Sequence, residues 1–188
     1  MLCASSNAGF CDECAEWTPA FDKGFACAEY GGVRNITHAF KYGGKAYYGE
    51  AISEMMFDRL RDELPEIDIV APVPMHKDKE RKRGYNQADV LASLLAKKLL
   101  LPYDRGVLIR KRATDAMSRL GSSVRSENIK GAFRAEPNRA KALRGRKILL
   151  VDDIYTTGST MNECALALKA AGAKAVYFVV FATGTDRI

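Results

Sequence analysis

The residues of this sequence best suited to chemistry lie in one stretch, residues 151–160, which reads VDDIYTTGST. Two adjacent carboxylates, Asp152 and Asp153, follow a run of apolar residues, and a turn rich in hydroxyl groups comes next. Backbone N–H groups in the first turn of a helix lack internal partners and carry partial positive charge, so they bind phosphate. Gly158 would let the backbone approach such an anion closely. The stretch therefore predicts an anion site beside a pair of acids.

The two carboxylates repel an anion, so they suit sugar hydroxyls or a metal ion that such hydroxyls hold. The turn supplies the groups that suit a phosphate: Thr156, Thr157, Gly158, Ser159 and Thr160. A diol site beside a phosphate site describes a ribose 5-phosphate. The spacing of Thr160 and Glu163 also fits a helix capping box, but a cap needs one hydroxyl and no pair of acids. We therefore favour ligand binding over capping alone.

Strand and helix patterns alternate around this turn. An apolar strand over residues 148–151 precedes it, a helix over 158–171 follows, and a last strand covers 175–181. Earlier in the chain we predict a strand over 25–30, helices over 31–42 and 51–64 (the second ended by Pro65), a strand within 67–74, a helix after Asn86 and a strand over 106–109. This order predicts an α/β fold with a mostly parallel sheet flanked by helices.

Ligands of such sheets bind beyond the carboxyl ends of the strands. We predict that two loops reach this edge, residues 72–83 and residues 152–160. Residues 110–126 are polar and basic without a clear period, so we predict a mobile loop there.

The amino-acid composition excludes several classes of protein. The chain has 188 residues, is 47% apolar, and carries 29 Lys and Arg against 23 Asp and Glu, for a net charge of +6. These values exclude collagen-like, coiled-coil and fully disordered chains. We find no signal-peptide pattern and no apolar run near the roughly 18 residues of a membrane span, so we predict a cytoplasmic protein without membrane insertion. Residues 105–147 hold 13 of the basic residues and three acids, a charge excess that suggests an anionic partner.

The cysteines leave two interpretations open. Cys11 and Cys14 have the C-x-x-C spacing with which two thiolates bind one tetrahedral zinc ion, and Cys3 and Cys27 could supply the other two ligands. Alternatively, the knuckle is incomplete and Cys27 packs as a small apolar residue in a strand. Residues 1–24 contain few aliphatic side chains, and we predict a small cysteine-containing appendage there.

The segment VDDIYTTGST resembles the fingerprint of the type I phosphoribosyltransferases, which bind 5-phosphoribosyl pyrophosphate. Over residues 11–182 the chain more closely resembles the competence-associated ComF family. That resemblance rests on Cys11-x-x-Cys14, YGGVR at 30–34, KYGG at 41–44, Val73-Pro74, RGYNQA at 83–88, RSEN at 125–128 and GAF at 131–133. It implies a phosphoribosyltransferase fold over residues 25–188. It also implies that residues 1–24 are a shortened zinc ribbon, because relatives usually carry two C-x-x-C pairs.

The resemblance also implies residue roles. Asp152 and Asp153 become the catalytic pair that holds the ribose 2- and 3-hydroxyls, and the turn from Thr156 to Thr160 holds the 5-phosphate. The residues of the implied pyrophosphate loop are Pro74, Met75, His76 and Lys77. The cations of the implied mobile catalytic loop are Arg110, Lys111, Arg112 and Arg119. Magnesium is the expected cofactor, bridging ribose and diphosphate oxygens.

Two functions follow from this comparison. The first is an enzyme that transfers the phosphoribosyl group to an unknown acceptor. The second is a non-catalytic adaptor that senses the same ligand in DNA uptake or recombination, with a DNA-uptake helicase or single-stranded DNA as partner. The basic cluster at 77–83 gives little support to DNA binding, because Asp78 and Glu80 interrupt it and no aromatic residue lies within it for base stacking. We therefore favour the enzyme.

Overall fold

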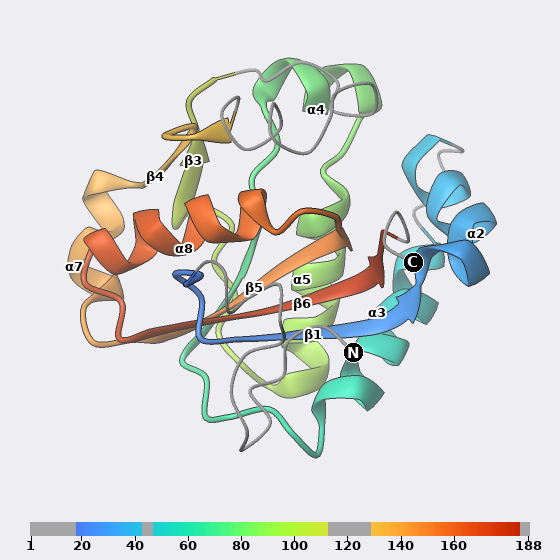
Figure 1. Cartoon of the computed structure of the whole chain (residues 1–188), viewed down its shortest axis with the longest axis horizontal. Coiled ribbons are helices and arrows are strands. Elements are labelled where there is room, and N and C mark those ends of the chain that lie inside the picture. The colour runs from blue at the N-terminus through green and yellow to red at the C-terminus, as the bar shows by residue number, and fades with distance from the viewer. Residues whose placement is uncertain (1–17, 43–46, 113–128, 185–188) are drawn as a thin grey trace.

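A computed structural model of the chain describes residues 18–42, 47–112 and 129–184 (Figure 1). Its centre is a four-stranded sheet in the order β1 (Lys23–Glu29), β6 (Ala175–Thr183), β5 (Lys147–Tyr155) and β2 (Ile69–Pro72). All three neighbouring pairs are parallel. The predicted α/β fold with a parallel sheet is therefore confirmed, and the carboxyl ends of all four strands lie at one edge.

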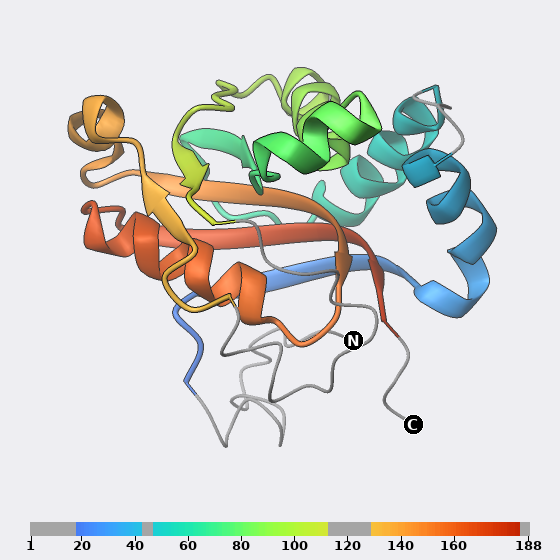
Figure 2. The same ribbon diagram turned by 90° about the horizontal axis from the view of Figure 1, so that it is seen from above.

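Helices cover both faces of the sheet. Figure 2 shows α3 (Tyr48–Leu60) and α5 (Gln87–Leu99) on one face and α8 (Ser159–Ala170) on the other. Helix α2 (Tyr30–Tyr42) continues directly from β1 and lies beside the carboxyl ends of β1, β5 and β6 (Figure 1). Within the described residues, no helix is both long and apolar enough to cross a bilayer.

Strand β5 separates two hydrophobic cores. Ile148 and Leu150 are fully buried in the core under α8, whereas Leu149 and Val151 are fully buried in the core under α3 and α5. This alternation follows from the pleat of a strand, in which successive side chains point to opposite faces. A strand with both faces buried is apolar throughout, as the sequence of β5 shows before its acids begin.

Smaller elements surround the main sheet. Strands β3 (Leu108–Arg110) and β4 (Phe133–Ala135) form an antiparallel pair, so not every pairing in the fold is parallel. A 3₁₀ turn η2 (Pro137–Arg139) leads into the short helix α7 (Ala140–Leu143). Helix α4 (Lys77–Arg83) joins the end of β2 to α5.

Three predicted elements need correction. The helix expected to run to Pro65 ends at Leu60, and the segment predicted as a loop over 72–83 contains α4. Helix α4 has acidic residues in its first turn and basic residues in its last, an order that complements the helix dipole. The strand predicted over 148–151 continues to Tyr155, because residues beyond Val151 still pair with β6.

The cysteines of the proposed zinc set fall in different regions. Cys3, Cys11 and Cys14 lie outside the described residues. Cys27 is a half-buried residue of β1, and burial raises the pKa of its thiol to about 12. An ordinary packed thiol fits this environment. Phe21, just before β1, is buried against the ring of Phe178, so the ordered core begins before the first strand.

Candidate functional site

The two acids of the candidate site lie inside β5 and not after it. Because side chains alternate along a strand, Asp152 lies on the α8 face and Asp153 on the opposite face. Asp153 is 8% exposed, and its Oδ2 is 2.7 Å from the Nζ of Lys41, in the last turn of α2. The structure thus places the predicted pair at the carboxyl edge of the sheet, but with the two carboxylates in different surroundings.

Asp152 has a perturbed pKa. Its Oδ1 accepts a hydrogen bond of 2.9 Å from the backbone N–H of Asp153. Burial, together with the neighbouring carboxylate of Asp153, raises the pKa of Asp152 to about 8, and Lys41 opposes this shift. A partly buried acid beside a second acid is a common feature of ligand sites, because both effects disfavour the charged form in the absence of a partner.

The turn after β5 keeps the first amides of α8 free of side-chain caps. Gly158 is the N-cap, with a φ of 77°, and no described side chain caps the helix. A β-carbon at this position would overlap the Tyr155 hydroxyl, so the turn requires glycine. The oxygens Thr157 Oγ1 and Ser159 Oγ are 2.9 Å apart, which places two hydroxyls together at the helix start.

The capping box suggested by the spacing of Thr160 and Glu163 does not form. Glu163 Oε2 instead accepts a hydrogen bond of 2.5 Å from the backbone N–H of Gly131. The hydroxyls of the turn are therefore not explained by capping, and the start of α8 retains the donors that an anion needs.

The predicted pyrophosphate loop is the passage from β2 into α4. His76 is the N-cap of α4: its Nδ1 accepts a hydrogen bond of 3.3 Å from the backbone N–H of Asp78. Nδ1 of His76 is therefore occupied in capping α4. Lys77, the first residue of α4, lies beside a cavity of about 160 Å³.

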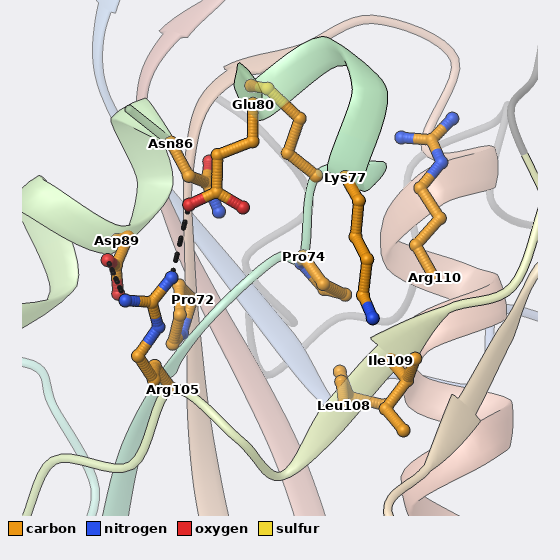
Figure 3. A pocket seen from close by; sticks show the side chains of 11 residues that line it. Pro72, Pro74, Lys77, Glu80, Asn86, Asp89, Arg105, Leu108, Ile109 and Arg110 are labelled. Atoms are coloured by element: carbon orange, nitrogen blue, oxygen red, sulfur yellow. Dashed lines mark hydrogen bonds and ion pairs between the residues drawn. The ribbon is translucent and has the colours of Figure 1, made fainter. Parts of the chain in front are cut away.

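Figure 3 shows this cavity between the end of β2, α4 and β3. Lys77 of α4 and Arg110 of β3 both line it and contribute positive charge. Arg105 also lines it, but its guanidinium is paired with Glu80 at 3.1 Å and with Asp89 at 3.5 Å. Both of these acids line the cavity as well, and the remaining lining residues are Pro72, Pro74, Met75, Asn86, Leu108 and Ile109. The structure thus brings three predicted loop residues, Pro74, Met75 and Lys77, to the same cavity as Arg110.

Arg110 links this cavity to the acid pair. It ends β3, and its guanidinium lies 5.3 Å from the centre of the Phe133 ring. Burial lowers the pKa of Arg110, and the nearby Cys164 and Asp152 side chains partly oppose this shift. Lys111 and Arg112 are exposed, and Arg112 donates to the carbonyl of Lys130 at 2.5 Å. Arg119 lies outside the described residues.

Asn86 and Tyr85 hold the parts of the site together. Asn86 is buried, its Nδ2 donates to the Val73 carbonyl at 3.0 Å, and its Oδ1 caps α5 by accepting from the Ala88 N–H at 3.2 Å. The Tyr85 hydroxyl donates to the carbonyl of Phe40 in α2. The motif RGYNQA marks these residues in the sequence, but it does not reveal what they contact. Lys41 likewise lies in a family segment whose role only the fold shows.

The donors present fit a magnesium ion held mainly by a bound ligand. Carboxylate oxygens suit Mg²⁺, which commonly takes one or two carboxylates and completes its shell with water and phosphate oxygens. Within the described part of the chain, no cluster of three or more His, Cys, Asp or Glu side chains could hold a metal alone. Asp152 and Asp153 could supply such oxygens beside a ligand.

The fold and the site together define a phosphoribosyltransferase-type domain. Residues 85–187 match the family described as Phosphoribosyl transferase domain. The fold is also similar to glutamine phosphoribosylpyrophosphate amidotransferase from B. subtilis, with a TM-score of 0.50 and 18% identity, over 77% of this chain and 30% of that one.

Relatives in sequence identify the family more closely. The chain is 31% identical to the DNA utilization protein YhgH of Escherichia coli over 88% of its own length and 74% of the relative's. It is 29% identical to competence protein F of Haemophilus influenzae over 88% and 75% of the two chains. A match to competence protein ComFC of Bacillus subtilis, 31% identical, covers 55% of this chain and 39% of that protein. The chain belongs to the ComF family.

Proposed function

We propose that the protein binds 5-phosphoribosyl pyrophosphate with Mg²⁺ and transfers the phosphoribosyl group to an acceptor. The strongest support is the start of α8, where Gly158 is the N-cap and no described side chain caps the helix. This helix start follows shortly after two acids at the carboxyl edge of a parallel sheet. An anion site and a diol site side by side match the two ends of a ribose 5-phosphate.

In this proposal the 5-phosphate accepts hydrogen bonds from the first amides of α8 and from the hydroxyls of the turn. Asp152 and Asp153 accept hydrogen bonds from the ribose hydroxyls. Lys77 and Arg110 face the diphosphate in the neighbouring cavity. Each group thereby meets a partner of complementary charge or hydrogen-bonding type.

The reaction breaks the bond between C1 of the ribose and the diphosphate, and the acceptor forms a new bond to C1. Positive charge develops on the ribose ring while negative charge grows on the leaving diphosphate. The acid pair lies on the ribose side and the cations lie on the diphosphate side, so both charges are stabilised by groups already in place. Bound Mg²⁺ would add further positive charge at the leaving diphosphate.

Titration calorimetry with 5-phosphoribosyl pyrophosphate and MgCl₂ tests the binding step. We expect binding by the wild-type protein and none by the variant that combines Asp152→Asn and Asp153→Asn. Absence of binding by the wild type would refute the proposal. Pyrophosphate release in the presence of candidate bases then tests the transfer step.

A second candidate is a non-catalytic adaptor that senses the same ligand. The names of the relatives, competence protein F and DNA utilization protein, favour it. An adaptor would bind the phosphoribosyl donor and a helicase or single-stranded DNA, but would release no pyrophosphate with any base. Helix α4 offers a cationic surface for this role, and replacing Arg81 and Lys82 by Ser should weaken binding of labelled single-stranded DNA if it serves as one.

We also retain the proposal of a zinc site formed by Cys3, Cys11, Cys14 and Cys27. Support comes only from the cysteine spacing and the family resemblance. Metal analysis of the purified protein decides it: about one zinc per chain, lost in Cys11→Ser, is the expected result. The cytoplasmic location remains a prediction from the sequence.

A further inference from the structure

We infer that Lys41 is a positioning residue that holds the Asp153 carboxylate in place for the ribose of the phosphoribosyl donor. This inference rests on the proposed function, since it assigns to the donor site a residue that lies outside the VDDIYTTGST segment. The two charged atoms are 2.7 Å apart, and the two side chains are only 20% and 12% exposed. A contact this short and this sheltered differs from the exposed ion pairs elsewhere on the protein.

The backbone at Lys41 is fixed by its neighbours. Phe40 is 1% exposed in the core under α2, α3 and α5, and its carbonyl accepts the hydrogen bond of the Tyr85 hydroxyl. The rings of Phe40 and Tyr85 also pack 5.9 Å apart. Because both the residue before Lys41 and the strand that carries Asp153 are anchored, the ammonium and the carboxylate meet in a defined geometry.

The charges around the acids explain why a cation is needed there. Asp153 lies next to a second acid, Asp152, and a phosphoribosyl donor brings several negative charges to the same edge, so an ionised Asp153 needs a nearby cation. Lys41 supplies positive charge on the α2 face and Arg110 supplies it on the α8 face. A buried ion pair contributes little net stability to a fold, so its presence at a ligand site points to a role in positioning.

Lys41 also occupies a favourable place for a cation. It is the basic residue in the last turn of α2, where the carbonyl end of the helix attracts positive charge. Arginine at this position would preserve the charge and could still reach the carboxylate, whereas methionine would preserve only the length of the apolar stem. These two substitutions therefore separate charge from packing.

The test is a double-mutant cycle on donor binding, measured by calorimetry with 5-phosphoribosyl pyrophosphate and MgCl₂. We expect Lys41→Met to weaken binding by about tenfold or more, as loss of a sheltered charge pair implies. Lys41→Arg should recover most of the affinity. In an Asp153→Asn background, Lys41→Met should change the remaining affinity by less than about threefold, because its partner charge is already absent.

Lys98→Met is the matched control. Lys98 pairs with Glu54 at 2.5 Å and with Glu50 at 3.2 Å on the α3–α5 surface, away from the site. The Lys98→Met variant should bind the donor with the same affinity as the wild type. Should Lys41→Met unfold at the assay temperature, Lys41→Gln replaces it in the same cycle.

The outcomes separate the two claims. If the wild type binds no donor, the proposed function fails. If the wild type binds and Lys41→Met binds equally well, only the role of Lys41 fails. An equal loss in the wild-type and Asp153→Asn backgrounds would also overturn the inference, because Lys41 would then act without Asp153. Failure of Lys41→Arg to restore binding would count against it in the same way.

Discussion

Replacing Asp152 by Asn should make the folded protein more stable while it weakens donor binding. Burial and the charge of Asp153 raise the pKa of Asp152 from an ordinary 3.8 to about 8. Each tenfold change in proton affinity corresponds to about 1.4 kcal/mol, so holding this acid in the folded state costs at most roughly 4 kcal/mol at pH 7. Because part of its surface reaches solvent, and Asn must also be desolvated, we expect a net gain of about 1–3 kcal/mol.

The pH dependence gives this prediction a signature of its own. The folded protein binds more protons than the unfolded chain between the two pKa values, so the contribution of Asp152 is largest below about pH 4 and is lost as the pH rises through about 8. Asn does not titrate. The advantage of Asp152→Asn over the wild type should therefore be small near pH 4 and grow steadily toward pH 8.

Urea unfolding of both proteins across this pH range is the assay, with Asp68→Asn as control. Asp68 accepts hydrogen bonds of 2.8 Å from Arg146 and from the Lys147 N–H, and these lower its pKa. Its ionised form stabilises the fold above the ordinary pKa, so Asp68→Asn should be less stable than the wild type at pH 7, and the difference should shrink in acid. If Asp152→Asn were no more stable than the wild type, or its advantage did not depend on pH, the reasoning about the buried acid would be refuted.

Three further substitutions test two left-handed backbone positions and one helix cap. Gly158→Ala should cost about 1–2 kcal/mol and abolish donor binding, because φ is 77° and the new methyl group meets Tyr155; urea unfolding and calorimetry measure both effects. Leu100→Gly should raise stability by about 0.5–1 kcal/mol, since Leu100 is 91% exposed at a φ of 55°, and a lower midpoint would contradict this. Asn86→Ala should cost about 1–3 kcal/mol in thermal unfolding, because it removes the cap of α5 and leaves the buried Val73 carbonyl without this donor. Unchanged stability of Asn86→Ala would argue against its role as a link between β2 and α5.

Local patterns were sufficient to predict the main sheet. The apolar residues 148–151 and 175–181 predict buried strands, and the turn between them, which contains Gly158, predicts the start of a helix. The structure confirms a parallel pair with α8 as the crossover. These features depend on neighbouring residues, so periodicity and turn chemistry reveal them.

Elements without an apolar period were harder to predict. Helix α4 consists of seven charged residues, so no hydrophobic pattern marks it. Two signals could have found it: acids before bases along the segment, and Gly84 in the left-handed C-cap position. The continuation of β5 through Asp152 and Asp153 had no such signal, because acidic residues are depleted in strands and only pairing with β6 extends it.

Contacts between distant segments could not be predicted from the sequence. Nothing near Lys41 indicates that it meets Asp153, and nothing near Arg110 indicates that its charge acts on Asp152. The contact of Lys41 with Asp153 arises because β1, which leads into α2, and β5 end at the same edge of the parallel sheet. Arg110 comes from β3, in the second sheet. The sequence could supply the list of candidate residues, but only the topology assigns each cation to an acid.

The two acids lie inside β5, and this position gives them different surroundings. Had both carboxylates followed the strand, they could have shared one environment and one cation. Within the strand they point to opposite faces, so Asp153 pairs with Lys41 of α2, whereas Asp152 lies on the α8 face and makes no such ion pair among the described residues. In the proposed function, a ribose that engages both acids therefore contacts two carboxylates whose charges are set by different neighbours.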